Sequence, residues 1–169
     1  MTLDTIQHIL SIAAPFAIIT GVIIALVQLR SQYRLRQMDI VMKLYSSFGE
    51  EAFIRHFQRV TSWEYTTYAA YRKKNSREDY VSLLVVSVFF KNMGLLLKRR
   101  LAPLELLDDL LSGPILEAWP KARPIWVGLR EEHNHPAWAE WFEFFHDAMA
   151  QRMDQLNGIR SPKKSGHGS

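Results

Sequence analysis

The sequence lacks cysteine throughout its 169 residues. This absence excludes a disulfide framework, a thiolate metal site and a cysteine nucleophile. The sequence also has no G-x-S-x-G motif and no glycine-rich loop of the kind that holds phosphate groups. Strand-like runs that alternate apolar and polar residues between turn pairs are absent as well, so we predict an all-α fold.

Formal charge is missing from residues 5–29, and most residues of the run 6–29 are apolar. About 20 apolar residues, each rising about 1.5 Å along a helix, cross a hydrocarbon core of about 30 Å. We therefore predict an N-terminal transmembrane helix over 6–29. A cleaved signal peptide is the rival interpretation, but the segment has no basic start, too long an apolar stretch and no small-residue cleavage site after Leu29.

The two flanks of this run differ in charge, since Asp4 precedes it and only basic residues follow closely. Lys and Arg favour the cytoplasmic side of a membrane span. We expect a single-pass protein of the cell inner membrane, with its N-terminus outside and its C-terminal domain in the cytoplasm. The basic residues expected to contact anionic headgroups of the bilayer are Arg30, Arg34, Arg36 and Lys43.

Small side chains recur every four residues within the run. Such a face lets two membrane helices approach closely, which predicts a homo-oligomer, although alanine is also simply common in membrane spans. The residues of this packing face are Ala13, Ala17, Gly21 and Ala25.

The net charge of +4 is modest, and its excess lies beside the predicted span and in the C-terminal tail. The basic clusters at residues 73–77 and 98–100 adjoin expected helix ends, where solvated residues are common. We therefore expect no nucleic-acid partner, because such a partner needs a basic face within the fold.

The remaining chain predicts a compact multi-helix cytoplasmic bundle. We divide the sequence into the N-terminal segment and span (1–29), a basic juxtamembrane helix (30–49), a helical cytoplasmic domain (50–157) and a disordered tail (158–169). Gly49 is the expected end of the juxtamembrane helix. The apolar stripe of that helix is Leu35, Met38, Val41, Met42, Tyr45 and Phe48.

Residues 77–98 are apolar nearly all round, which predicts the central, fully buried helix of the bundle. Ser76 is a plausible N-cap, because acidic residues follow it in the first turn. A second membrane span is the alternative, but Lys91 interrupts the run and would cost about 2.5–3.5 kcal/mol inside a bilayer. Gly94 would let a neighbouring helix come close.

Prolines divide the rest of the chain. We expect a short helix from Pro103 that ends at Gly113–Pro114, and a further helix in which Pro120 and Pro124 lie in first turns or at kinks. Residues 131–136 form a polar loop. Pro136 is expected to open the last helix, which Asn157–Gly158 end. The apolar stripe of that helix is Trp138, Trp141, Phe142, Phe145, Met149, Met153 and Leu156.

Candidate chemistry is sparse. Glu143 and His146 have the spacing of a helical di-iron motif, but no second motif accompanies them. His133 and His135, with His146 as third ligand, could hold a metal, although histidines in such a loop are more often solvated. We expect no catalytic residue, metal or cofactor.

Three charged residues also bear on possible chemistry. Asp108 and Asp109 diverge on a helix and are expected to be solvated. Arg130 is expected to pair with an acid such as Glu143 or, alternatively, to present its charge to an anionic ligand.

The stretches FFKNMGLLLKRRL, LDDLLSGPI, WPKARPI and WFEFF, together with Arg130, resemble an uncharacterised bacterial family that is catalogued as a domain of unknown function. The resemblance implies one N-terminal membrane span, a basic juxtamembrane helix and a helical cytoplasmic domain. Lys91 departs from the pattern, in which an acid follows the paired phenylalanines. The matching structural or interaction residues are Phe90, Gly94, Trp119, Pro124, Arg130, Trp141, Phe142 and Glu143.

Three hypotheses follow for the function. The first is a non-enzymatic, membrane-anchored helical interaction or regulatory domain that works with an unidentified protein partner. The second is a membrane effector of the stress or phage-defence type, which assembles through the small-residue face. The third is a metal-dependent enzyme built on His133, His135 and His146.

Overall fold

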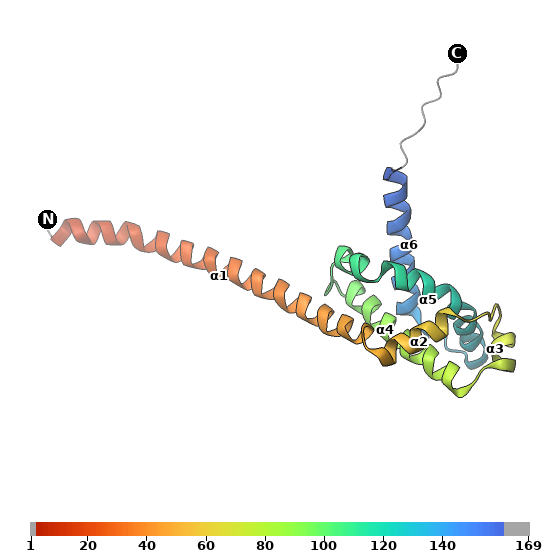
Figure 1. Cartoon of the computed structure of the whole chain (residues 1–169). Coiled ribbons are helices and arrows are strands. Elements are labelled where there is room, and N and C mark those ends of the chain that lie inside the picture. Colours follow the sequence, from red (N-terminus) through yellow and green to blue (C-terminus); the bar gives the residue numbers. More distant parts are fainter. Residues whose placement is uncertain (1–2, 161–169) are drawn as a thin grey trace, which may run out of the picture. The chain divides into compact units, whose positions relative to one another are not determined.

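The computed structural model describes residues 3–160, although the side chains of residues 3–15, 17, 34, 44, 159 and 160 lie outside this description. Within it the predicted all-α fold is confirmed, since every regular element is a helix and no strand occurs (Figure 1). The elements are α1 (Leu3–Phe48), α2 (Glu51–Thr61), α3 (Tyr68–Lys74), α4 (Arg77–Lys98), α5 (Leu104–His133) and α6 (Glu140–Arg160).

The chain forms two compact units, which divide between Ile40 and Val41. The first unit is a single stretch of helix, whose described side chains are nearly all exposed. The second unit is the helical bundle, and it begins with the last turns of α1. There Val41 is fully buried, and Phe48 packs against Phe53 with ring centroids 5.1 Å apart. The domain boundaries expected at residues 29, 49 and 157 stay predictions.

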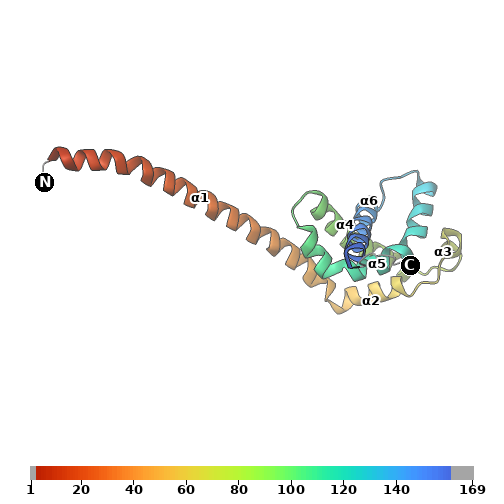
Figure 2. The same cartoon turned by 90° about the horizontal axis from the view of Figure 1, so that it is seen from above.

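Helix α4 is the centre of the bundle, because α2, α5 and α6 all pack against it (Figures 1 and 2). Its start follows from a local signal. The Ser76 hydroxyl accepts a hydrogen bond from the Asp79 backbone N–H at 3.1 Å, and the Asp79 carboxylate accepts one from the Ser76 N–H at 2.8 Å. This reciprocal capping box satisfies two N–H groups that the helix leaves unpaired, so the predicted N-cap is confirmed.

The prediction that α4 is fully buried is wrong. Leu83, Val86 and Phe90 are completely buried, but the opposite face is open, with Tyr80 47% and Val88 54% exposed. Among the described residues α4 is also the one helix long and apolar enough to cross a membrane, with half of that stretch buried in the bundle. A core helix of a soluble domain has the same properties. Helix α4 is therefore apolar on all sides, but only one side is buried by the other helices.

Gly94 confirms the predicted close approach between helices. A methyl group at this position would overlap the carbonyl oxygen of Trp141 on α6. Beside it, the Phe90 ring stacks on Phe142 with centroids 5.1 Å apart, and Trp119 of α5 meets the same ring edge-on at 4.8 Å. The packing of α4, α5 and α6 thus depends on a glycine at position 94 and on three aromatic rings.

Helix α5 corrects the prediction that Gly113–Pro114 separate two helices. It is continuous from Leu104 to His133 and contains Pro114, Pro120 and Pro124. Each interior proline removes one backbone hydrogen bond and destabilises a helix by about 3 kcal/mol. The buried stripe of α5 continues across all three prolines, and each large apolar side chain in it contributes about 1.5–3 kcal/mol. Pro120 is exposed and the other two are half-buried, so the prolines interrupt the side of the helix that faces away from the core.

Helix α6 begins later than predicted. Pro136 does not open it, and Trp138 lies in the turn before Glu140 rather than on the helix. Ala139 has a φ of 57°, a left-handed conformation that cannot continue a helix towards Trp138. At the other end α6 continues through Gly158 to Arg160, so Gly158 does not end it. The tail was predicted to be disordered over 158–169, which is wrong for residues 158–160 because they belong to α6. The rest of that prediction, residues 161–169, lies outside the described residues.

Candidate functional site

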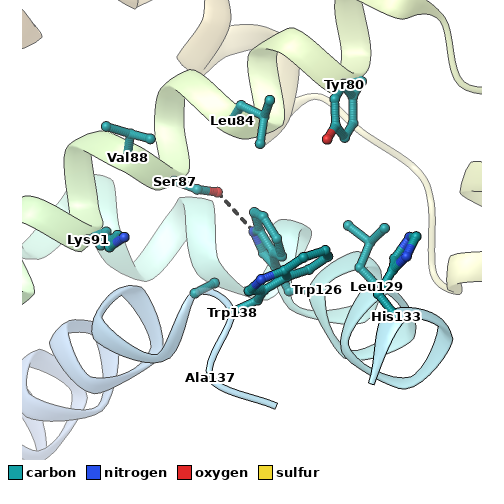
Figure 3. A pocket seen from close by; sticks show the side chains of 11 residues that line it. Tyr80, Leu84, Ser87, Val88, Lys91, Trp126, Leu129, His133, Ala137 and Trp138 are labelled. Atoms are coloured by element: carbon teal, nitrogen blue, oxygen red, sulfur yellow. Dashed lines mark hydrogen bonds between the residues drawn. The ribbon is translucent and has the colours of Figure 1, made fainter. Parts of the chain in front are cut away.

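A pocket of about 600 Å³ opens between α4, α5 and the turn before α6 (Figure 3). Helix α4 forms one wall with five residues of a single face, and α5 forms the opposite wall. Cavities of this size are typical of small-molecule sites. The lining residues are Tyr80, Leu84, Ser87, Val88, Lys91, Trp126, Leu129, His133, Ala137, Trp138 and Ala139.

Two tryptophans form the floor of the pocket. The indole N–H of Trp126 donates a hydrogen bond to the Ser87 hydroxyl at 2.9 Å, and both residues are buried. The ring of Trp138 meets Trp126 edge-on, with centroids 6.4 Å apart. The hydroxyl of Ser87 is directed from α4 towards these rings (Figure 3). This bond fixes the Trp126 ring and places an oxygen atom beside the two indole rings.

The turn that carries Trp138 is held by Arg130 of α5. The Arg130 Nε donates to the Trp138 carbonyl oxygen at 2.6 Å, and its Nη1 donates to the Glu143 carboxylate at 2.8 Å. The pairing of Arg130 with Glu143 was expected from the sequence and is confirmed. His135 stacks on the Trp138 ring at 5.0 Å, with 16° between the planes. Arg130 is therefore a positioning residue for one wall of the pocket.

The three histidines proposed as metal ligands do not come together. His133 and His135 both lie against the ring of Trp138, whereas His146 bonds to Asp147 at 3.0 Å beside Trp119. Across the described residues no three His, Asp or Glu side chains are placed to share a metal ion. The metal site that the third hypothesis places on His133, His135 and His146 is therefore not formed.

Asp79 is the most buried acid of the bundle, at 7% exposed, and its hydrogen bonds are structural. Its carboxylate accepts from the Arg59 Nε at 2.8 Å, from the Trp63 indole N–H at 3.3 Å and from the Ser76 backbone. Burial alone would raise the pKa of Asp79. Hydrogen bonds from Ser76, Arg59 and Trp63 outweigh burial and hold this pKa below its usual value. A carboxylate so fully engaged joins α2 to α4 and is not presented to a substrate.

Asp108 and Asp109 were both predicted to be solvated. Asp109 is exposed as predicted, but the prediction is wrong for Asp108, which is buried. The Asp108 carboxylate accepts a hydrogen bond from the Arg152 Nε at 2.6 Å, which joins α5 to α6. This ion pair could not be predicted from the sequence, because Asp108 and Arg152 lie on different helices.

The residues named by the family resemblance lie where α4, α5 and α6 meet. Phe90 and Phe142 stack, Gly94 faces the Trp141 backbone, and Glu143 pairs with Arg130. Trp119 is buried beside Phe142, and Pro124 lines a smaller cavity next to it. Packing and loop positioning account for this set.

Residues of the predicted membrane segment lie on α1. Gly21, Ala25, Arg30, Arg36 and Lys43 are exposed. The side chains of Ala13, Ala17 and Arg34 lie outside the described residues.

Sequence reasoning missed the pocket itself. Three of its polar residues, Tyr80, Ser87 and Lys91, share one helical face, at intervals of two turns and one turn. That spacing was the available signal. It was hidden because the apolar residues between them made the whole helix look buried.

The comparisons with known proteins confirm that the sequence resembles a domain of unknown function, while the bacterial origin and the membrane span stay predictions. A family model described as a domain of unknown function, DUF4760, matches residues 15–149. No curated protein and no solved structure matches the chain.

Proposed function

The chain belongs to this family of unknown function, and we propose that it is a membrane-anchored, non-enzymatic protein whose helical domain acts in the cytoplasm by binding. The observation that carries the proposal is the uncharged run over residues 6–29, with Asp4 before it and basic residues close after it. Its length suits a hydrocarbon core, and its flanks favour the basic side as cytoplasmic.

The bundle supports a binding role through its open apolar surface. Tyr80, Val81, Leu84 and Val88 are exposed on α4, next to the tryptophan-floored pocket. Contiguous apolar surface of this kind is characteristic of interaction sites. The ion pairs of Asp79, Asp108 and Arg130 hold helices and a turn together, which fits a domain built to present a surface.

The anchor can be tested by extraction of membranes with alkaline carbonate. We expect the full chain to stay in the pellet. The double variant Ile19→Lys/Val22→Lys places two charges in mid-run, each opposing insertion by about 2.5–3.5 kcal/mol, and should move the chain to the supernatant. Leu35→Lys is the matched control, because it adds a charge outside the run and should leave the chain in the pellet. Recovery of the unmodified chain in the supernatant would refute the anchor.

A second function, an oligomerising membrane effector, is favoured by one observation on α1. A side chain added at Gly21 would meet nothing within 4 Å, and Ala25 is exposed. Small residues at every fourth position of a membrane helix let a second copy of the helix approach closely. The variant Ala17→Ile/Gly21→Ile should abolish oligomers detected by cross-linking in membranes, and oligomers of unchanged size would reject this function.

A further inference from the structure

We propose that the pocket between α4 and α5 binds a small amphipathic monocarboxylate with an aromatic body. This inference deepens the binding role proposed for the domain but does not depend on the membrane anchor. The first argument is charge. Among the described residues that line the pocket none is Asp or Glu, whereas Lys91 is one of them and carries a positive charge. A single anionic group is therefore complementary to the pocket, and a cation is not.

Lys91 is the residue best placed to receive the carboxylate. It stands at one end of the α4 wall, exposed, and within the described part of the chain its ammonium group has no carboxylate partner. In Figure 3 its nitrogen lies at the end of the cavity remote from His133 and Tyr80. An elongated ligand can thus place its charged end at Lys91 and its body along the helix.

Ser87 offers a second polar contact from the floor of the pocket. Its oxygen accepts the hydrogen bond from the Trp126 indole, so the proton of its hydroxyl group is left to donate elsewhere. Within the described residues no acceptor for that proton is found, and Ser87 is 5% exposed. A ligand oxygen beside Ser87 would satisfy a buried donor, which is worth more than an equal contact at the surface.

The remaining lining specifies the body of the ligand. Trp126 and Trp138 present rings from below, and Leu84 and Val88 present aliphatic groups from α4. Flat aromatic groups gain both apolar burial and ring–ring contact in such a setting. The volume of about 600 Å³ accommodates a fused two-ring body with a short acid side chain.

The test uses the full chain labelled with 5-fluorotryptophan, in phosphatidylcholine nanodiscs, observed by fluorine NMR. The probe is naphthalene-2-acetate, and its neutral amide, naphthalene-2-acetamide, is the matched ligand. We expect saturable shifts of the Trp126 and Trp138 resonances, assigned by Trp→Phe variants, while those of Trp63, Trp119 and Trp141 stay in place. The acetate should bind roughly fivefold more tightly than the amide, as one ion pair at a partly exposed site allows.

Two variants make the result specific. Lys91→Gln should weaken acetate binding roughly fivefold and leave amide binding unchanged, whereas the control Lys74→Gln on α3 should change neither. Ala137→Phe should fill the cavity and abolish the shifts with both ligands. Shifts of all five tryptophans together, equal binding of acetate and amide, or unchanged acetate binding in Lys91→Gln would each overturn the proposal. Such a failure leaves the anchor standing, because carbonate extraction tests the anchor separately.

Discussion

Replacing Gly94 by alanine should destabilise the bundle, although alanine is the better helix former. A Cβ atom at this position would overlap the backbone carbonyl of Trp141 and lie 3.2 Å from the Phe145 Cβ. Neither atom can move by side-chain rotation, so the backbone of α6 must shift away from α4. Since α4 and α6 form the largest contact in the bundle, this shift loosens the stacked rings of Phe90 and Phe142 as well.

The magnitude follows from two opposing effects. Alanine in a helix interior gains about 1 kcal/mol over glycine. Overpacking against a filled core costs about 1–3 kcal/mol, and the cost tends to the upper end here because the obstacle is backbone. We therefore expect the free energy of unfolding to fall by about 1–2 kcal/mol.

Urea denaturation followed by tryptophan fluorescence measures this change, because all five tryptophans lie in the bundle. Gly158→Ala on α6 is the matched control. A Cβ there meets nothing within 4 Å, so this variant should be as stable as the original or slightly more stable. If Gly94→Ala proved as stable as Gly158→Ala, the close approach of α4 and α6 would be refuted.

Three further predictions concern polar groups of the core. Asp79→Asn should lower the unfolding free energy by roughly 2–3 kcal/mol, because the charge-assisted bond from Arg59 is lost. The pKa of Asp79 is held below its ordinary value of 3.8, so its carboxylate stabilises the fold fully above that pH, and this stabilisation disappears as the pH falls through the folded pKa. When the free energy of unfolding is measured against acid pH, the variant should lack this part of the loss that the original chain shows. Burial raises the pKa of Tyr71 from 10.0 to about 12, so the neutral phenol stabilises the fold fully below pH 10 and this stabilisation is lost as the pH rises towards 12. In Tyr71→Phe the free energy of unfolding should therefore fall less at alkaline pH, by up to roughly 2–3 kcal/mol. An alkaline unfolding curve identical to that of the original chain would contradict this prediction. A double-mutant cycle of Arg152→Met and Asp108→Asn should give a coupling of about 1–3 kcal/mol in urea melts, and additive effects would show that the pair does not hold α5 to α6.

Local signals in the sequence were sufficient for α4. Its bounds agree with the prediction because Ser76 and Asp79 form their capping box within one turn, independently of the rest of the fold. The close approach at Gly94 could also be predicted, because a glycine within a long apolar helix leaves space for the backbone of a neighbouring helix. The pairing of Arg130 with Glu143 could be named because their helices are joined by a short turn.

Signals that compete with distant packing misled the prediction. Pro114 is a strong local reason to end a helix, yet the buried stripe of α5 continues on both sides of it. Trp138 fits the apolar spacing of α6, but that spacing does not distinguish a helix from the turn before it, and only the positive φ of Ala139 does. The pocket depends on α4, α5 and this turn together, so no single segment could predict it.

The central claim is that the N-terminal run spans a membrane and leaves the bundle in the cytoplasm. The absence of cysteine makes it directly measurable, because a single introduced cysteine is the only thiol in the chain. We predict that a membrane-impermeant maleimide labels Asp4→Cys in intact bacterial spheroplasts, and labels Lys74→Cys only after detergent is added. Labelling of Lys74→Cys in intact spheroplasts, or protection of Asp4→Cys until lysis, would contradict the account.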